Sequence, residues 1–270
     1  MKNSIRICVF IILVAWFSTE LHAQNPSSST TSNNPPSGLT NPTVVKAVSI
    51  FAGGKQVQNI QLTGMVITHY GDDDHGTATL TLNASGDSSL QYLLGNGTRK
   101  ETTGTNDAAT ACTWTSADGT PHTVPMHNCL RSIVWFLPAF SLQVASSSPY
   151  DIFVSYTPTD SSSSTVGVQH SRDFSHENNP KKPTTETVKQ MNDTLQNLSQ
   201  TKILVDPQTG NITSIEYDIH SDTNQQVNIP VVVRYSDYRA VNGVQIAFKV
   251  QKYVNNTLVE DLTVETAIVN

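Results

Sequence analysis

The sequence contains few charged residues. Asp, Glu, Lys and Arg make up only 14% of its 270 residues, and the formal net charge is −6. No run of basic residues interleaved with aromatic ones occurs anywhere in the chain. A nucleic-acid-binding face needs clustered Lys and Arg to neutralise phosphates, so the composition argues against that function. The low charge, together with abundant Thr, Val and Ile, favours pleated sheet over helix.

Long apolar runs are also lacking, apart from one near the N-terminus. That run covers residues 7–17 and is shorter than the ~20 residues that span a bilayer. Lys2 and Arg6 precede it, and a short polar stretch ending in Ala23 follows it. This three-part pattern predicts a secretory signal peptide over residues 1–23, which leaves no transmembrane anchor after cleavage. We therefore expect an exported bacterial protein, located in the periplasm or at the cell exterior.

The motifs of the common catalytic sites are missing. The chain has no GxSxG, no HExxH, no P-loop and no GxGxxG between a strand and a helix. Glycosidase carboxylates would need two acids held across a cleft. Glu260 and Glu265 fall on opposite faces of a predicted strand, and Glu216 and Asp218 share a face that we expect to meet solvent. We therefore predict a protein that is not an enzyme, with no catalytic residues and no cofactor.

The possible metal ligands have simpler interpretations. The DDDH run at 72–75 lacks the spaced ligands of a calcium loop and fits a hairpin turn. His122 and His127 could bind zinc together with the nearby cysteines, but loop histidines beside a disulfide are the favoured interpretation. We expect no metal site.

Cysteine is scarce, and cleavage of the signal peptide removes one of the three. The remaining two, Cys112 and Cys129, would lie in a compartment where disulfides persist. Neither a CxxC motif nor a pair of histidines at ligand spacing accompanies them, so a structural disulfide is favoured over a redox couple or a metal site. Closing a loop of this length would stabilise the fold by about 3 kcal/mol in the chain-entropy model.

The rest of the chain divides into a leader and one expected domain. Residues 24–43 are rich in Ser, Asn and Pro and predict a disordered leader. Residues 44–270 are expected to form a single domain in which apolar residues alternate with polar ones and turn signals separate short strands. Residues 77–84 show the pattern most clearly. Because no βαβ alternation is present, the pattern predicts an antiparallel sheet.

Two helices interrupt this alternation. Asn128 can cap a helix that runs through Phe136, and Pro138 should end or kink it. Residues 188–198 carry apolar side chains at spacings of three, four and three, the stripe of an amphipathic helix. Both apolar faces suit either an ordinary core or the wall of a ligand cavity.

The C-terminal strands carry a pattern that resembles a known family. It comprises ILVD at 203–206, a turn through Gly210, VVVRYSDYR at 231–239, VNGV at 241–244, and paired strands to the C-terminus. Over Thr201–Asn270 this is similar to the LolA/LolB-like lipoprotein-carrier superfamily. The resemblance implies a mainly β fold with a few helices (α+β). Its strongly curved antiparallel sheet, or half-open β-barrel, is covered by helices, and the cavity between them binds acyl chains or another apolar ligand.

On this interpretation, a hydrophobic small molecule or lipid lies between the sheet and the two helices. The expected wall and floor residues are Trp135, Phe136, Phe140, Val188, Met191, Leu195, Val231, Val233, Phe248 and Val250. The protein would bind, carry or sense a lipid, with a lipoprotein or an envelope protein as a further class of partner. The alternative is an extracytoplasmic structural or protein-interaction module, in which the same residues form a dry core.

Overall fold

The computed structural model gives the conformation of most of the expected domain. It describes residues 42–106, 109–125, 128–129, 135–145, 152–158, 164–170, 184–221 and 224–270. The expected signal peptide and most of the leader lie outside these ranges, as does His127. No helix within the described ranges is long and apolar enough to cross a membrane.

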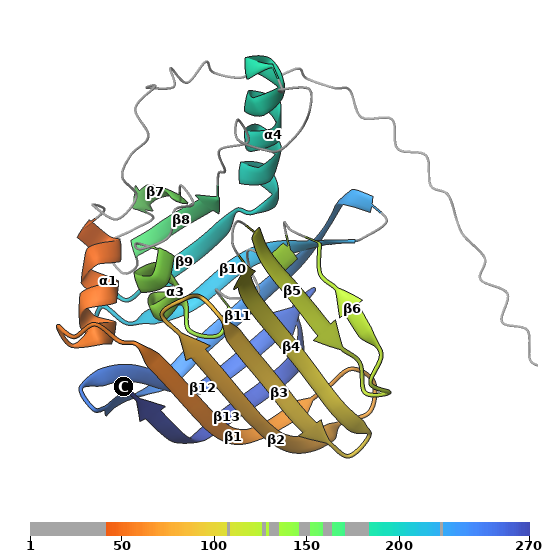
Figure 1. Cartoon of the computed structure of the whole chain (residues 1–270). Helices are drawn as coiled ribbons and strands as arrows, with labels where there is room; N and C mark the ends of the chain where they lie inside the picture. The colour runs from red at the N-terminus through yellow and green to blue at the C-terminus, as the bar shows by residue number, and fades with distance from the viewer. Residues whose placement is uncertain are drawn as a thin grey trace, which may run out of the picture. The chain divides into compact units, whose positions relative to one another are not determined.

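Within these ranges, thirteen strands form one antiparallel sheet in the order β6-β5-β4-β3-β2-β1-β13-β12-β11-β10-β9-β8-β7 (Figure 1). Six strands come from the first half of the chain: β1 (Asn59–Thr68), β2 (Asp74–Asn83), β3 (Ser88–Leu94), β4 (Gly97–Asn106), β5 (Ala109–Thr115) and β6 (Pro121–Thr123). The other seven are β7 (Ile152–Pro158), β8 (Ser164–His170), β9 (Thr201–Val205), β10 (Ile212–Ser221), β11 (Asn224–Val241), β12 (Val244–Val254) and β13 (Thr257–Val269). Because β1 pairs with the last strand, β13, the two halves of the chain meet in the middle of the sheet.

Strand alternation places one face of the sheet in the core. On β2, Ala78, Leu80 and Leu82 are buried, whereas the threonines between them are exposed, which confirms the predicted alternation. Side chains point to opposite faces in turn along a strand, so a slip of one residue would turn every apolar side chain toward solvent. Burial of this one face therefore fixes the register.

The sheet is strongly curved, as predicted. Glu101 on β4 and Lys252 on β12 are separated by five strand steps, which would be about 24 Å in a flat sheet. Yet both side chains contact Trp135: Glu101 by a hydrogen bond, and Lys252 with its Nζ atom 4.4 Å from the ring centroid. The strands therefore bend toward one another around a concave face, and the sheet remains open because β6 and β7 are its two edges.

Two helices pack together at one end of the concave face. α1 (Pro42–Ala52) contacts both α3 (Pro138–Ala145) and β12, and the rings of Phe51 and Phe140 lie 6.2 Å apart. The turn after α1 lies against the β11–β12 turn, where Lys55 Nζ donates to the Asn242 carbonyl at 2.7 Å. Gly53 has a φ of +56°, and a Cβ there would lie 2.2 Å from a backbone oxygen of that turn. Only glycine fits this position.

The helix predicted to begin at Asn128 needs a partial correction. Residues 128–129 are helical and 130–134 lie outside the described ranges, but Trp135 and Phe136 form a turn, and a separate helix, α3, starts at Pro138. Proline suits the first position of a helix because its φ is preset and its missing N–H would have no partner there. Pro138 therefore begins a helix, where the sequence led us to expect an end or a kink.

The second predicted helix is confirmed as α4 (Thr185–Leu198). The Thr184 hydroxyl caps it by accepting from the Thr187 N–H at 3.1 Å. α4 contacts β8, toward the β7 edge of the sheet.

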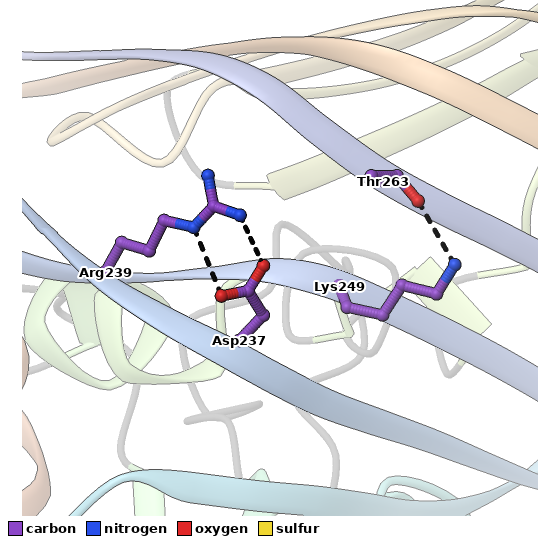
Figure 2. A network of polar contacts seen from close by, with 4 residues as sticks. All are labelled: Asp237, Arg239, Lys249 and Thr263. Atoms are coloured by element: carbon purple, nitrogen blue, oxygen red, sulfur yellow. Dashed lines mark hydrogen bonds and ion pairs between the residues drawn. The ribbon is translucent and has the colours of Figure 1, made fainter.

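A local departure from alternation occurs on β11. Asp237 has a left-handed φ of +52°, a conformation that Asp tolerates better than most residues. Figure 2 shows its carboxylate accepting two hydrogen bonds from Arg239, at 3.1 and 2.6 Å. Tyr235 and Tyr238, three residues apart, consequently border the same small cavity against α1 and α3. The left-handed residue thus lets two tyrosines from one strand pack beneath these helices.

Candidate functional site

A cavity of about 630 Å³ lies on the concave face, at the end of β1 and β13 away from α1. Its walls come from β3, β4, β5 and β13, with the residues just after β1 at its rim. Leu90 and Tyr92 form a buried apolar wall, whereas Tyr70 and Trp114 are 50% and 41% exposed at the opening. The cavity therefore combines an apolar interior with an aromatic rim.

A buried carboxylate, that of Glu260, lines this cavity. It accepts hydrogen bonds from the Tyr70 hydroxyl at 2.7 Å and the Tyr92 hydroxyl at 2.9 Å, and Lys252 Nζ lies 3.3 Å away. Register explains the arrangement, because Glu260 is directly opposite Lys252 on β12 and opposite Thr68 at the end of β1. A buried charge with several hydrogen-bond partners forms a rigid element.

The electrostatics of this group fix its protonation states. Burial raises the pKa of Glu260, but the Lys252 ammonium and the two phenols outweigh it, and the pKa of Glu260 lies below its ordinary value. Burial lowers the pKa of Lys252, but the Glu260 carboxylate, acting together with Tyr70, Glu101 and Tyr217, outweighs this effect, and the pKa of Lys252 is raised. Burial and the same carboxylate raise the pKa values of Tyr70 and Tyr92. At neutral pH the group is an ion pair held by two neutral phenols.

A second carboxylate, that of Glu101, shares the same ammonium. Glu101 lies on β4 opposite Trp114 and hydrogen-bonds the Trp135 side chain. Burial and the nearby Glu260 raise the pKa of Glu101, and Lys252 only partly opposes them. Two carboxylates therefore compete for one buried cation, and Glu101 is the one that takes up a proton more readily.

We expect this competition to appear as a pH dependence of stability that Glu101→Gln removes. The folded-state pKa of Glu101 is above its ordinary value of 4.5, so from that pH upward the folded state holds more protons than the unfolded state. Its contribution to stability is lost as the pH rises, and each pH unit between the unfolded-state and folded-state pKa values removes about 1.4 kcal/mol. Urea unfolding between pH 4.5 and 8 should show Glu101→Gln gaining stability relative to the wild type.

The control for this measurement is Thr102→Val, a neighbouring substitution on β4 that removes no titratable group. Its stability difference from the wild type should stay constant across the same pH range. A constant difference for Glu101→Gln as well would contradict the assignment of a raised pKa.

Two contacts complete the rim of the cavity: one between a cation and an aromatic ring, and one between two stacked rings. The Arg99 guanidinium lies 5.3 Å from the centroid of the Tyr70 ring. Trp114 stacks on His122 with their rings 4.1 Å apart. His122 was a possible zinc ligand in the sequence, and the structure places it against an aromatic ring at the edge of the sheet. The described residues contain no group of three side chains that could hold a metal ion.

The ten residues predicted to contact a ligand lie in several places. Trp135, Phe136 and Phe140 are buried, and the first two border a cavity of only about 30 Å³, which has room for little more than water. The four predicted sheet residues, Val231, Val233, Phe248 and Val250, are buried in the core. On α4, by contrast, Leu195 is buried, Val188 is half-buried and Met191 is exposed. Their role as ligand contacts remains a prediction.

The sequence analysis did not predict that Glu260 lines a cavity or that Lys252 is its buried partner. Glu260 was considered only as a partner of Glu265, which is exposed on β13, and Lys252 was not considered. The available signal was an ionisable residue at an inward position of the alternating β12 and β13 strands. Such a residue lies on the concave face and needs a partner there.

The predicted disulfide between Cys112 and Cys129 is confirmed. Both residues are buried, and the bond joins β5 to the short helical segment at 128–129. The predicted turn at 72–75 is confirmed in part, because β2 already begins at Asp74. The Asp74 carboxylate accepts from the backbone N–H groups of Gly95 and Asn96, which ties this end of β2 to the next hairpin.

Comparison with known proteins gives likenesses of fold alone. No family model matches the sequence, and no curated protein matches it. Among solved structures, the chain is similar to a domain assigned as an outer membrane lipoprotein-sorting protein from Vibrio parahaemolyticus, with a TM-score of 0.45 and 6% identity over 88% of this chain and 94% of that one. It is also similar to a DUF1329 family protein from Desulfovibrio piger (TM-score 0.46) and a LolA superfamily protein from Nitrosomonas europaea (TM-score 0.45). Both are 8% identical over 83% of this chain and 90% of theirs. Two of these descriptions, the lipoprotein-sorting protein and the LolA superfamily protein, name the group that the C-terminal strands resemble in sequence pattern.

Proposed function

We propose that this protein is an exported, non-enzymatic binding protein that holds an amphipathic lipid on the concave face of its sheet. The observation that carries the proposal is the cavity of about 630 Å³, whose volume falls in the range of small-molecule sites. Leu90, Tyr92 and Trp114 offer apolar contact, and each acyl methylene buried there would contribute about 0.8 kcal/mol.

Binding without chemistry is supported by the state of the buried carboxylate. The oxygens of Glu260 are engaged by Tyr70, Tyr92 and Lys252, which suits a structural support better than a nucleophile or a base. The disulfide supports export, because such bonds persist in oxidising compartments. A carrier or a sensor of lipid is consistent with both features.

The test is ligand detection on the exported protein, purified after removal of the expected signal peptide. Native mass spectrometry should reveal bound lipid as dissociable mass. Lysophospholipid added at one hundred times its Kd should raise the free energy of unfolding by about 2.7 kcal/mol, measured as a rise in Tm. Trp114→Ala should weaken the effect, whereas Leu93→Ala, at an exposed position on β3, is the matched control and should not.

A bare mass and an unchanged Tm with every lipid would contradict the proposal. That result would favour the alternative, an extracytoplasmic interaction module with a dry core.

A further inference from the structure

Opposite charges lie side by side on one strand within the cavity. Arg99 and Glu101 are two residues apart on β4, so they share its concave face at a spacing of about 7 Å. Both line the same cavity, with Arg99 paired to Tyr92 and Glu101 paired to Trp114 in the flanking strands. A ligand in the cavity would therefore meet a cation and a carboxyl group at a fixed separation.

The Glu101 end of the cavity suits a cation. Two carboxylates, those of Glu101 and Glu260, share the single ammonium of Lys252, so one negative charge there lacks a full counter-charge. Trp114, directly opposite Glu101, offers an aromatic surface that is 41% exposed. A carboxylate beside an aromatic face is a favourable setting for an amine or a quaternary ammonium group.

The Arg99 end suits an anion. In the part of the chain that the structure describes, the Arg99 guanidinium forms no ion pair, and its described contact is with the Tyr70 ring. A guanidinium offers a planar set of donors that matches the oxygens of a phosphate. The Lys100 residue on the same strand also lines the cavity.

We propose that the cavity selects a lipid with a zwitterionic head group, in which a phosphate lies against Arg99 and an amine lies between Glu101 and Trp114. This inference rests on the proposed function and specifies the ligand class. A phosphate and an amine joined by a two-carbon spacer match the order of charges along β4. The acyl chain would then extend over the apolar wall formed by Leu90.

The experiment compares three lipids of equal chain length: lysophosphatidylethanolamine, lysophosphatidylglycerol and a monoacylglycerol. Titrations followed by tryptophan fluorescence and by Tm should show the zwitterionic lipid binding at least about tenfold more tightly than the other two. Glu101→Gln should weaken binding of the zwitterionic lipid about tenfold and leave the anionic lipid unchanged. Arg99→Gln should weaken both phospholipids and leave the monoacylglycerol unchanged.

Two further variants keep the test independent of folding defects. Glu101→Asp retains the charge and should retain the preference, and Lys189→Gln, exposed on α4, should behave as the wild type. Circular dichroism and Tm without lipid establish that each variant is folded. Equal affinity for all three lipids would overturn this inference while leaving the proposed function intact. Failure of every lipid to bind would overturn both.

Discussion

Replacing Lys252 with methionine is expected to lower the free energy of unfolding by about 3–5 kcal/mol. The side chains of Lys252 and Glu260 are only 14% and 7% exposed, and the ammonium is the only cation that faces this carboxylate among the described residues. Without it, Glu260 must stay charged and uncompensated in the core or take up a proton. The two phenols that donate to Glu260 cannot replace the missing charge.

Urea unfolding at neutral pH measures this effect against a matched ion pair. Lys189 and Asp193 on α4 are 68% and 57% exposed, so Lys189→Met should cost less than about 0.5 kcal/mol. The double variant Lys252→Met with Glu260→Met should recover part of the loss, because it removes the charges of the closest pair and leaves only the Glu101 carboxyl without the ammonium. A loss for Lys252→Met no larger than that for Lys189→Met would show that the pair is not held as the structure indicates.

Strands with apolar inward residues were predictable from the sequence, whereas β4, which contributes Arg99 and Glu101 to the cavity, was not. β2 and the C-terminal strands alternate cleanly and were found. β4, with the sequence GTRKETTGTN, points Arg99, Glu101 and Thr103 toward the concave face, so the apolar period is absent and the strand was missed. A strand that directs charge inward breaks the local rule, and such failures are expected at functional sites.

The helices show the same division between local and tertiary information. α4 was predicted because its stripe is local. α1 was missed although residues 44, 47, 48 and 51 have helical spacing, because its position depends on contacts with α3 and β12. The site itself needs register: Tyr70 and Glu260 are 190 residues apart, and only the pairing of β1 with β13 brings them together.

Removing the disulfide by Cys112→Ala and Cys129→Ala is expected to lower the free energy of unfolding by about 3 kcal/mol. The bond closes a loop between residues 17 positions apart, and without it the unfolded chain gains the conformational freedom that the bond removes. Both side chains are buried, so the loss should be no smaller than the loop term. Urea unfolding of the double variant and of the reduced wild type should give the same midpoint, well below that of the oxidised protein.

The matched control is a substitution of Thr113, the residue that follows Cys112 on β5. The Thr113 hydroxyl on β5 forms a hydrogen bond with that of Thr102 on β4 at 2.7 Å on the exposed face, so Thr113→Ala should change stability by less than about 1 kcal/mol.

The Cys112–Cys129 disulfide also joins β5 to the part of the chain that precedes Trp135, whose ring contacts both Glu101 and Lys252. Reduction should therefore weaken lipid binding as well as stability. An oxidised and a reduced protein with equal midpoints and equal lipid affinity would contradict this prediction.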